Sequence, residues 1–218
     1  MLAPLLLLVL CWLLVRSAKE PERTPQPAGA APTRAWDLLR EPMFRRLLFV
    51  NWLQSSSWDV HAFVLPILGH ERGLGASVIG TILGIFAIAA VAVRLALPLF
   101  ANRTSERGVI LTSTLVTASL FCVYPLLHSA WAMALCSVVL GFSLGAVQPM
   151  VMSMLHQITP HARHGEALGL RLLTINASSV AMPMLFGTMG ALIGISGLFW
   201  IAGGVVALGA RATWGLKA

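Results

Sequence analysis

The chain has 218 residues, of which 57% are hydrophobic and 11% are charged, and its mean hydropathy is +0.82. Because a soluble domain carries about 25% charged residues, this chain lacks the polar surface of a water-soluble protein, and lipid is its natural solvent. The net charge of +7 comes with a single Tyr and with no recognisable nucleic-acid-binding module, so we expect no nucleic-acid partner.

An apolar stretch at residues 2–15 opens the chain. As a helix it would be about 21 Å long, which is short of a hydrocarbon core of about 30 Å. It is either a signal peptide or the end of a longer membrane helix. No Lys or Arg precedes it, and "VRSA" has Arg16 where a signal peptide has a small residue. We therefore favour a partial transmembrane helix at residues 1–16 that begins upstream of this chain.

Residues 17–42 form the only long polar stretch, and Pro, Ala and Gly dominate its middle, which predicts a flexible cytoplasmic linker. Its end, "TRAWDLLR", is expected to form one or two turns of interfacial helix. Six stretches of about the length of a spanning helix follow. They are residues 44–68, 76–100, 109–127, 129–155, 167–193 and 197–214. The sequence thus predicts an all-α, polytopic membrane protein with a six-helix transmembrane bundle at residues 43–218.

The basic residues are distributed very unevenly between alternate connections. Fourteen of the fifteen Lys and Arg residues fall on one side of the membrane, and Arg72 alone falls on the other. Lys and Arg are retained on the cytoplasmic side. The linker, the loop "ANRTSERG" at residues 101–108 and the C-terminus are therefore predicted to be cytoplasmic.

Two of these loops resemble loops of the major facilitator superfamily. The superfamily pattern Gly-x-Leu-Ala-Asp-Arg-x-Gly-Arg-Arg falls on residues 98–107. Ala101, Arg103 and Arg107 match it, whereas Pro98, Asn102, Ser105 and Glu106 depart from it. "PHARHGEALG" is similar to a second family loop at Pro160, Gly165, Ala167 and Gly169, with His164 where Arg is usual. The order of elements resembles the last part of the sixth helix through the twelfth helix of a bacterial-type member.

The resemblance implies a secondary active transporter of a small solute in a bacterial-type inner (plasma) membrane, without cofactor, metal ion or catalytic residue. The chain would be its C-terminal half, so that an N-terminal six-helix half is the missing partner. Asn102, Arg103 and Arg107 would form a cytoplasmic gating loop, in which Asn102 replaces the acid of the family. The alternative is a truncated membrane protein that no longer transports and has a structural or interaction role.

Small residues recur at helical spacing on three predicted helices, which indicates helix contacts or a cavity lining. The stripes are Gly80, Gly84, Ala87, Val91, Arg94 and Pro98; Gly141, Gly145, Gln148 and Met152; and Asn176, Ser179, Pro183, Gly187, Gly190 and Gly194. Arg94 either faces the bundle in a functional role or extends to the cytoplasmic interface, about 9 Å from its Cα along the helix.

The most polar predicted helix contains "NWLQSSSWDVH", in which Asn51, Ser55 and Trp58 share a face and Gln54 and Asp59 flank it. Asp59 lies about 22 Å along from residue 44, near mid-membrane, and a lone acid there indicates a site for a cation, a proton or a cationic substrate. The alternatives are a structural hydrogen bond or a helix that ends early in a water-filled vestibule. The expected substrate or proton pathway is Asp59, Asn51, Gln54, Ser55, Trp58, Arg94, Gln148 and Asn176.

Two patterns resemble an enzyme motif and a metal site, but neither has the context or the spacing that such a site requires. "GFSLG" matches the Gly-x-Ser-x-Gly nucleophile pattern, but it lies inside an apolar predicted helix instead of a strand-to-helix turn. His156, His161 and His164 fit no standard zinc spacing. We expect a protein without catalytic activity.

The charge distribution gives a test of the orientation. Single cysteines at Ser105 and Ser77, in a variant without Cys11, Cys122 and Cys136, should react with a membrane-impermeant thiol reagent from opposite sides of the membrane, the first from the cytoplasm. Labelling of both positions from one side would contradict the predicted topology.

Overall fold

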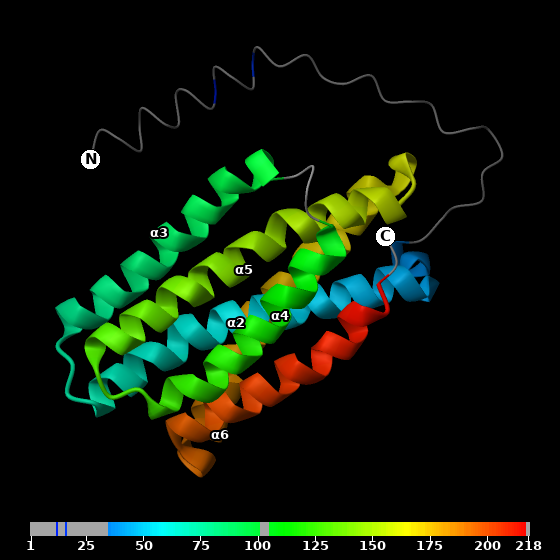
Figure 1. Ribbon diagram of the computed structural model, residues 1–218. Coiled ribbons are helices and arrows are strands. Elements are labelled where there is room, and N and C mark those ends of the chain that lie inside the picture. The colour runs from blue at the N-terminus through cyan, green and yellow to red at the C-terminus, as the bar shows by residue number, and fades with distance from the viewer. Residues whose placement is uncertain (1–11, 13–15, 17–34, 101–104, 217–218) are drawn as a thin grey trace. The chain divides into compact units, whose positions relative to one another are not determined.

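The computed structural model describes Trp12, Arg16 and residues 35–100 and 105–216 (Figure 1). The chain divides into two units, Met1–Thr33 and Arg34–Ala218. Apart from Trp12 and Arg16, the expected partial helix lies outside the described residues, as does the expected linker up to residue 34. The helices from residue 35 onward belong to the second unit.

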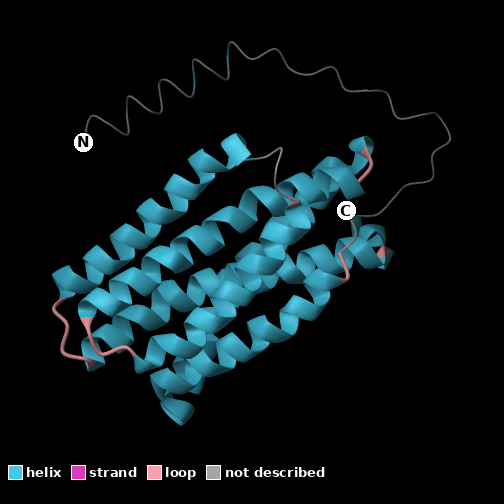
Figure 2. Ribbon diagram, in the orientation of Figure 1, coloured by secondary structure: helices cyan, strands magenta, loops and turns pink. Residues whose placement is uncertain are grey.

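Helices make up nearly all of the described second unit, and it contains no strand (Figure 2). The all-α prediction is therefore confirmed. The elements are a short 3-10 helix η1 (Ala35–Arg40), α2 (Pro42–Glu71), α3 (Ala76–Phe100), α4 (Glu106–Val123), η3 (Tyr124–Leu126), α5 (Ala130–Ile158), η4 (His161–Arg163) and α6 (His164–Trp214).

Local sequence signals account for the helix boundaries. Pro42 stands in the first turn of α2, where its missing N–H costs nothing. Gly73 has a φ of 73° in the turn to α3, a conformation that glycine adopts without strain. Ser105 caps α4, because its side chain accepts a hydrogen bond from the backbone N–H of Gly108 at 3.2 Å.

Helix α6 consists of two arms, residues 164–193 and 195–214. Gly194 separates them with a φ of 75° and a ψ of 167°, a combination that interrupts a helix and favours glycine. Both ends of α6 lie near the start of α2: Arg171 hydrogen bonds to Asn51, and Arg46 hydrogen bonds to the Gly215 carbonyl. The arms therefore fold back on each other (Figure 1). Together with α2, α3, α4 and α5 they make six helical rods in the described part of the unit.

The rods pack in a defined order. Helix α3 packs mainly on α5, α4 packs on both α5 and α6, and α2 packs on α6 and α5. One apolar cluster, which includes Leu65, Tyr124 and Phe199, fills the bundle toward the turn between α2 and α3. A second cluster, which includes Phe44 and Leu155, fills the opposite end.

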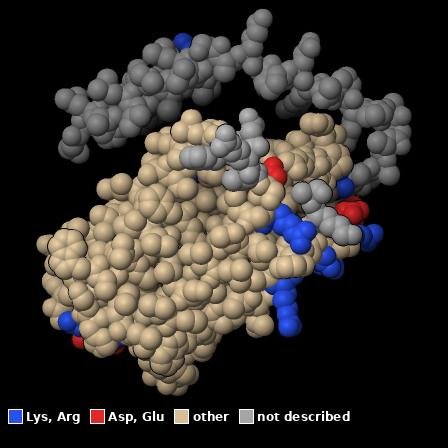
Figure 3. All heavy atoms as spheres, viewed as in Figure 1, with Lys and Arg blue, Asp and Glu red and all other residues tan. Residues whose placement is uncertain are grey.

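Four described helices are long and apolar enough to cross a membrane. They are Ala76–Leu99, Glu106–Leu126, Ala130–Ile158 and His161–Trp214, the last containing both arms of α6. Helix α2 has 30 residues but is the least hydrophobic of the long helices, because its middle holds the polar stretch 51–61. Charged side chains gather mainly at one end of the bundle (Figure 3). We call this the basic end; it carries the starts of α2 and α4.

The structure separates the three small-residue stripes into two kinds. A Cβ on Gly141 would lie 2.5 Å from the Phe86 carbonyl oxygen, and one on Gly145 would lie 2.7 Å from the Ala90 Cα, so these glycines let α5 and α3 pack backbone to backbone. Gly80, Gly84 and Gly187, in the other two stripes, are exposed, and a Cβ on any of them would meet nothing within 4 Å in the described part of the chain.

The two kinds of glycine predict opposite effects of the same substitution. Gly141→Ala should lower the stability of the chain by about 1–3 kcal/mol, because the added methyl group would force two helix backbones apart. The matched control Gly84→Ala, on the helix that α5 contacts, should be neutral or stabilising, since alanine is the better helix former. The midpoint of unfolding in a mixed-micelle denaturant titration, followed by circular dichroism, measures both. Equal destabilisation would contradict the packing.

Candidate functional site

Polar side chains of four of the six rods are linked across helices, and two of them, Arg94 and Ser179, are exposed. We call the linked side chains the polar belt and define it as Asn51, Trp58 and Asp59 of α2, Arg94 of α3, Gln148 of α5, and Arg171, Ser178 and Ser179 of the first arm of α6. Three contacts join these residues across helices.

Pro149 creates the first contact, between α3 and α5. Proline has no N–H, so in α5 it leaves the carbonyl of Gly145, four residues earlier, without its helical hydrogen bond. The Nε of Arg94 donates to this carbonyl at 3.4 Å, and the guanidinium carbon lies 5.7 Å from the centroid of the Trp58 ring. Arg94 thus extends toward the middle of α2 and α5. The alternative of an arginine that reaches the cytoplasmic interface would require it to extend toward the basic end.

Arg171 forms the second contact, between α6, α2 and α5. Its Nε donates to the Asn51 Oδ1 at 3.2 Å, and its Nη2 donates to the Gln148 Oε1. Arg171 is partly buried, and Asn51 is 1% exposed. The guanidinium is therefore held by two neutral amides, and no carboxylate lies within ion-pair distance in the part of the chain that the structure describes.

Asp59 forms the third contact, between α2 and α6. Its carboxylate accepts hydrogen bonds from the hydroxyl groups of Ser178 at 3.3 Å and Ser179 at 3.5 Å. The Ser178 hydroxyl lies 2.9 Å from that of Ser56, which extends the contact along α2. Asp59 and Arg94 form no ion pair, in line with the different depths estimated for their backbones.

Three residues of the expected pathway lie apart from these contacts. Gln54 is 3% exposed and donates to the Thr114 hydroxyl at 2.8 Å, so it points toward α4. Ser55 is buried. Asn176 is exposed, and its amide donates to the carbonyl of Leu172 in its own helix at 2.8 Å. Gln54 therefore joins α2 to α4, whereas Asn176 lies on the exposed side of the first arm.

The loop at residues 101–108 is described only in part. Asn102 and Arg103 lie outside the described residues. Arg107 donates to the carbonyl of Trp214 at 2.6 Å, and Glu106 accepts from Ser153 at 3.0 Å and from Gln157 at 2.8 Å. The start of α4 is thus attached both to α5 and to the end of α6.

Sequence reasoning did not select Arg171, Ser178 or Ser179 as a group. Arg171 counts among the cytoplasmic charges in the topology argument, but it lies two turns inside α6. A usable signal existed: Arg171 and Ser178 are seven residues apart and therefore on the same helical face. His61 was also passed over; it is fully buried, stacks on Phe86 and lies 3.0 Å from the Ser137 hydroxyl.

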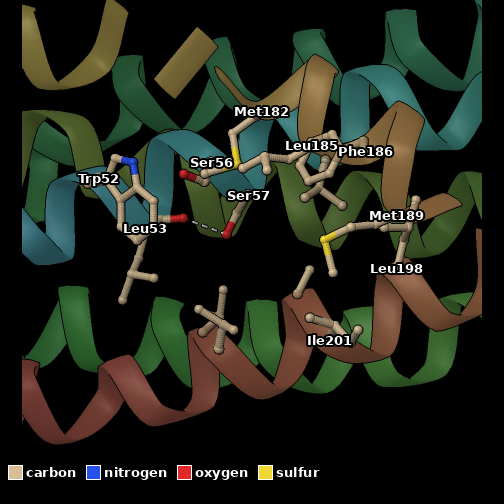
Figure 4. Close-up of a pocket in the computed structure, with 14 residues that line it drawn as sticks. Trp52, Leu53, Ser56, Ser57, Met182, Leu185, Phe186, Met189, Leu198 and Ile201 are labelled. Atoms are coloured by element: carbon tan, nitrogen blue, oxygen red, sulfur yellow. Dashed lines mark hydrogen bonds between the residues drawn. The ribbon is translucent and has the colours of Figure 1, made fainter. Parts of the chain in front are cut away.

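A cavity of about 160 Å³ lies beside the belt, between α2 and the two arms of α6 (Figure 4). Its walls are almost entirely apolar, with Met182, Phe186 and Met189 on one side. Of its two serines, Ser57 donates to the Leu53 carbonyl of its own helix and Ser56 pairs with Ser178. The cavity offers no charged group, so the polar belt is the better candidate for a solute site.

A comparison with protein families identifies the family of this chain. The model of the Major Facilitator Superfamily matches residues 47–216, from the second turn of α2 to beyond the end of α6. The chain belongs to this superfamily. It is therefore an integral, multi-pass membrane protein of the major facilitator kind, a family of transporters. No curated protein matches the chain.

The belt predicts a specific stability effect in this superfamily member. Arg171→Met would leave the buried Asn51 Oδ1 and the partly buried Gln148 Oε1 without their donor, so stability should fall, by about 1–3 kcal/mol for the buried Asn51 group alone. Arg211→Met, an exposed arginine of the second arm, is the matched control and should have little effect. Denaturant midpoints measure the difference; two equal midpoints would show that Arg171 is not held by these amides.

Proposed function

We propose that the chain is the C-terminal six-helix half of a secondary active transporter, which moves a small solute by alternating access. The observation that carries the proposal is the polar belt. Ionisable side chains inside a membrane are costly and usually belong to substrate or ion pathways. The belt places Asp59, Arg94 and Arg171 on three of the rods around α5.

Two open edges support the existence of a second half. The exposed stripe of α3 contains Gly80 and Gly84, and the exposed stripe of the first arm of α6 contains Ser179 and Gly187. Small residues allow membrane helices to approach closely. Because α3 packs on α5 and α6 packs on α2, these stripes flank the belt. A second six-helix unit could therefore close over it along both edges.

Asp59 is the acid that we assign to proton or cation coupling. Its only polar partners among the described residues are the two serine hydroxyl groups, which neutralise no charge. The carboxyl can therefore take up a proton or a cation without first breaking an ion pair. Both serines belong to the first arm of α6, so the charge of Asp59 acts directly on the contact between α2 and that arm.

The charge distribution supports the orientation that we propose. Charged side chains gather at the basic end (Figure 3), whereas Arg72 at the other end donates to the carbonyls of Leu127 and Pro125. Basic loops remain in the cytoplasm. We place the C-terminus in the cytoplasm and the protein in a bacterial-type inner membrane.

Asp59→Asn tests the coupling role. The amide oxygen can still accept from Ser178 and Ser179, so folding should be kept, but the side chain can no longer exchange a proton. The measurement uses membrane vesicles prepared from the cells that produce the protein. The variant should no longer accumulate labelled solute when a pH gradient is imposed. The solute is the one that the unaltered protein accumulates from a panel of labelled sugars, amino acids, organic anions and organic cations.

Glu71→Gln is the matched control, since Glu71 is an exposed acid at the end of the same helix. It should leave accumulation unchanged. If Asp59→Asn accumulates the solute at the normal rate and with the normal pH dependence, Asp59 is a structural residue. If the unaltered protein accumulates nothing from the panel, the result favours the alternative of a non-transporting structural or interaction protein.

A further inference from the structure

The polar belt contains two guanidinium groups that lack a carboxylate partner among the described residues. The ion pairs that the described residues form with one another, Arg40 with Asp37 and Arg163 with Glu166, both lie outside the belt. Arg171 is bound by two amides. Arg94 uses its Nε for the Gly145 carbonyl, and its two terminal nitrogens make no hydrogen bond within the described part of the chain.

Both guanidinium groups reach the same turn of α5. Arg94 comes from α3 and binds the backbone of Gly145, whereas Arg171 comes from α6 and binds the side chain of Gln148. Residues three apart lie on the same side of a helix, separated by about 4.5 Å along its axis. Two cationic side chains thus reach neighbouring positions of α5, Arg94 as an exposed side chain and Arg171 as a partly buried one.

Asp59 offsets this charge only in part. Its carboxylate is directed to Ser178 and Ser179 and pairs with neither arginine. The belt therefore holds two positive groups and one negative group, an excess of one positive charge. An intramembrane cation is stable when an anion accompanies it, and a single negative charge is what the excess requires.

We propose that the polar belt binds a small organic monoanion through its carboxylate, with Arg94 as the binding residue. Terminal guanidinium nitrogens form paired, charge-assisted hydrogen bonds with a carboxylate. Trp58 beside Arg94 and the exposed Ala87 and Val91, on the preceding turns of α3, provide apolar contact for the rest of the molecule. Arg171 is a positioning residue, because its own hydrogen bonds hold Asn51 and Gln148 in place. The proposal rests on the proposed function for passage of the anion, but binding itself requires no transport.

Benzoate is a suitable probe, and benzamide, which has the same shape without the charge, is its matched control. The full chain, purified into nanodiscs, is dialysed to equilibrium against radiolabelled benzoate at neutral pH. We expect saturable binding to one site per chain that excess unlabelled benzoate displaces and that benzamide and benzylamine do not. Phenyl phosphate should compete less well than benzoate, since its charge of about −1.5 to −2 exceeds the excess on the belt.

Arg94→Gln should weaken benzoate binding about tenfold or more, because charge-assisted hydrogen bonds are lost. Arg45→Gln, which removes an exposed arginine at the basic end, should leave binding unchanged. Size-exclusion chromatography and circular dichroism establish that each variant is folded. If Arg94→Gln does not fold, the comparison of benzoate with benzamide on the unaltered chain still tests whether the site requires a carboxylate.

Three results would overturn the proposal: no saturable benzoate binding to the folded chain, equal competition by benzamide, or unchanged affinity in folded Arg94→Gln. The transport experiment on Asp59 is a separate measurement. If benzoate binds but no solute accumulates, the anion site is supported and the proposed transport function is contradicted. If an uncharged or cationic solute accumulates but benzoate does not bind, the transport function is supported and the anion site is contradicted.

Discussion

The position of the polar belt depends on the close contact of α3 with α5 at Gly141 and Gly145. A side chain at either glycine would collide with the backbone of α3, so only glycine permits the approach. The approach brings Arg94 within reach of the Gly145 carbonyl, which Pro149 has left without its helical donor. The same contact places Phe86 against Trp58 and His61 of α2, with ring centroids 4.7 and 4.1 Å apart. Three helices are thereby aligned through one glycine-mediated interface.

Neutral and charged polar groups have different roles in this bundle. Neutral pairs join helices that pack closely: Gln54 with Thr114 connects α2 to α4, Ser143 with Thr117 connects α5 to α4, and Ser137 connects His61 to Tyr124. These pairs satisfy hydrogen-bonding groups that would otherwise be costly in an apolar interior. The ionisable groups Asp59, Arg94 and Arg171 lie instead on α2, α3 and α6 around α5, where every partner that they find is neutral. The first set joins helices to one another, whereas the second set is the candidate site for a charged solute or ion.

The basic end is joined by long side chains that donate to the end of α6. Arg46 donates to the carbonyl of Gly215 and Arg107 to that of Trp214, which satisfies carbonyls that a helix terminus leaves open. Glu106 attaches α4 to Ser153 and Gln157 of α5. The family pattern has an acid at Asn102, but the acid of this loop that the structure describes is Glu106. A movement of α4 at this end would therefore have to break these hydrogen bonds or displace the ends of α5 and α6.

The sequence by itself determined the elements of this protein. Six apolar stretches predicted six helical rods, and the break at Gly194 falls in the predicted gap between residues 193 and 197. The charged side chains collect mainly at one end of the bundle (Figure 3). Hydropathy and helix length can be read from the sequence because they depend only on neighbouring residues. Helical periodicity also showed which residues share a face. It did not show which neighbour each face meets: Gly141 packs on α3 whereas Gly84 faces open space, Gln54 points to α4, and Arg171 joins α2 and α5. Those partners come from residues up to 120 positions away in the chain. Only the tertiary structure decides them, because the rotation and approach of each helix are set by packing against all the others.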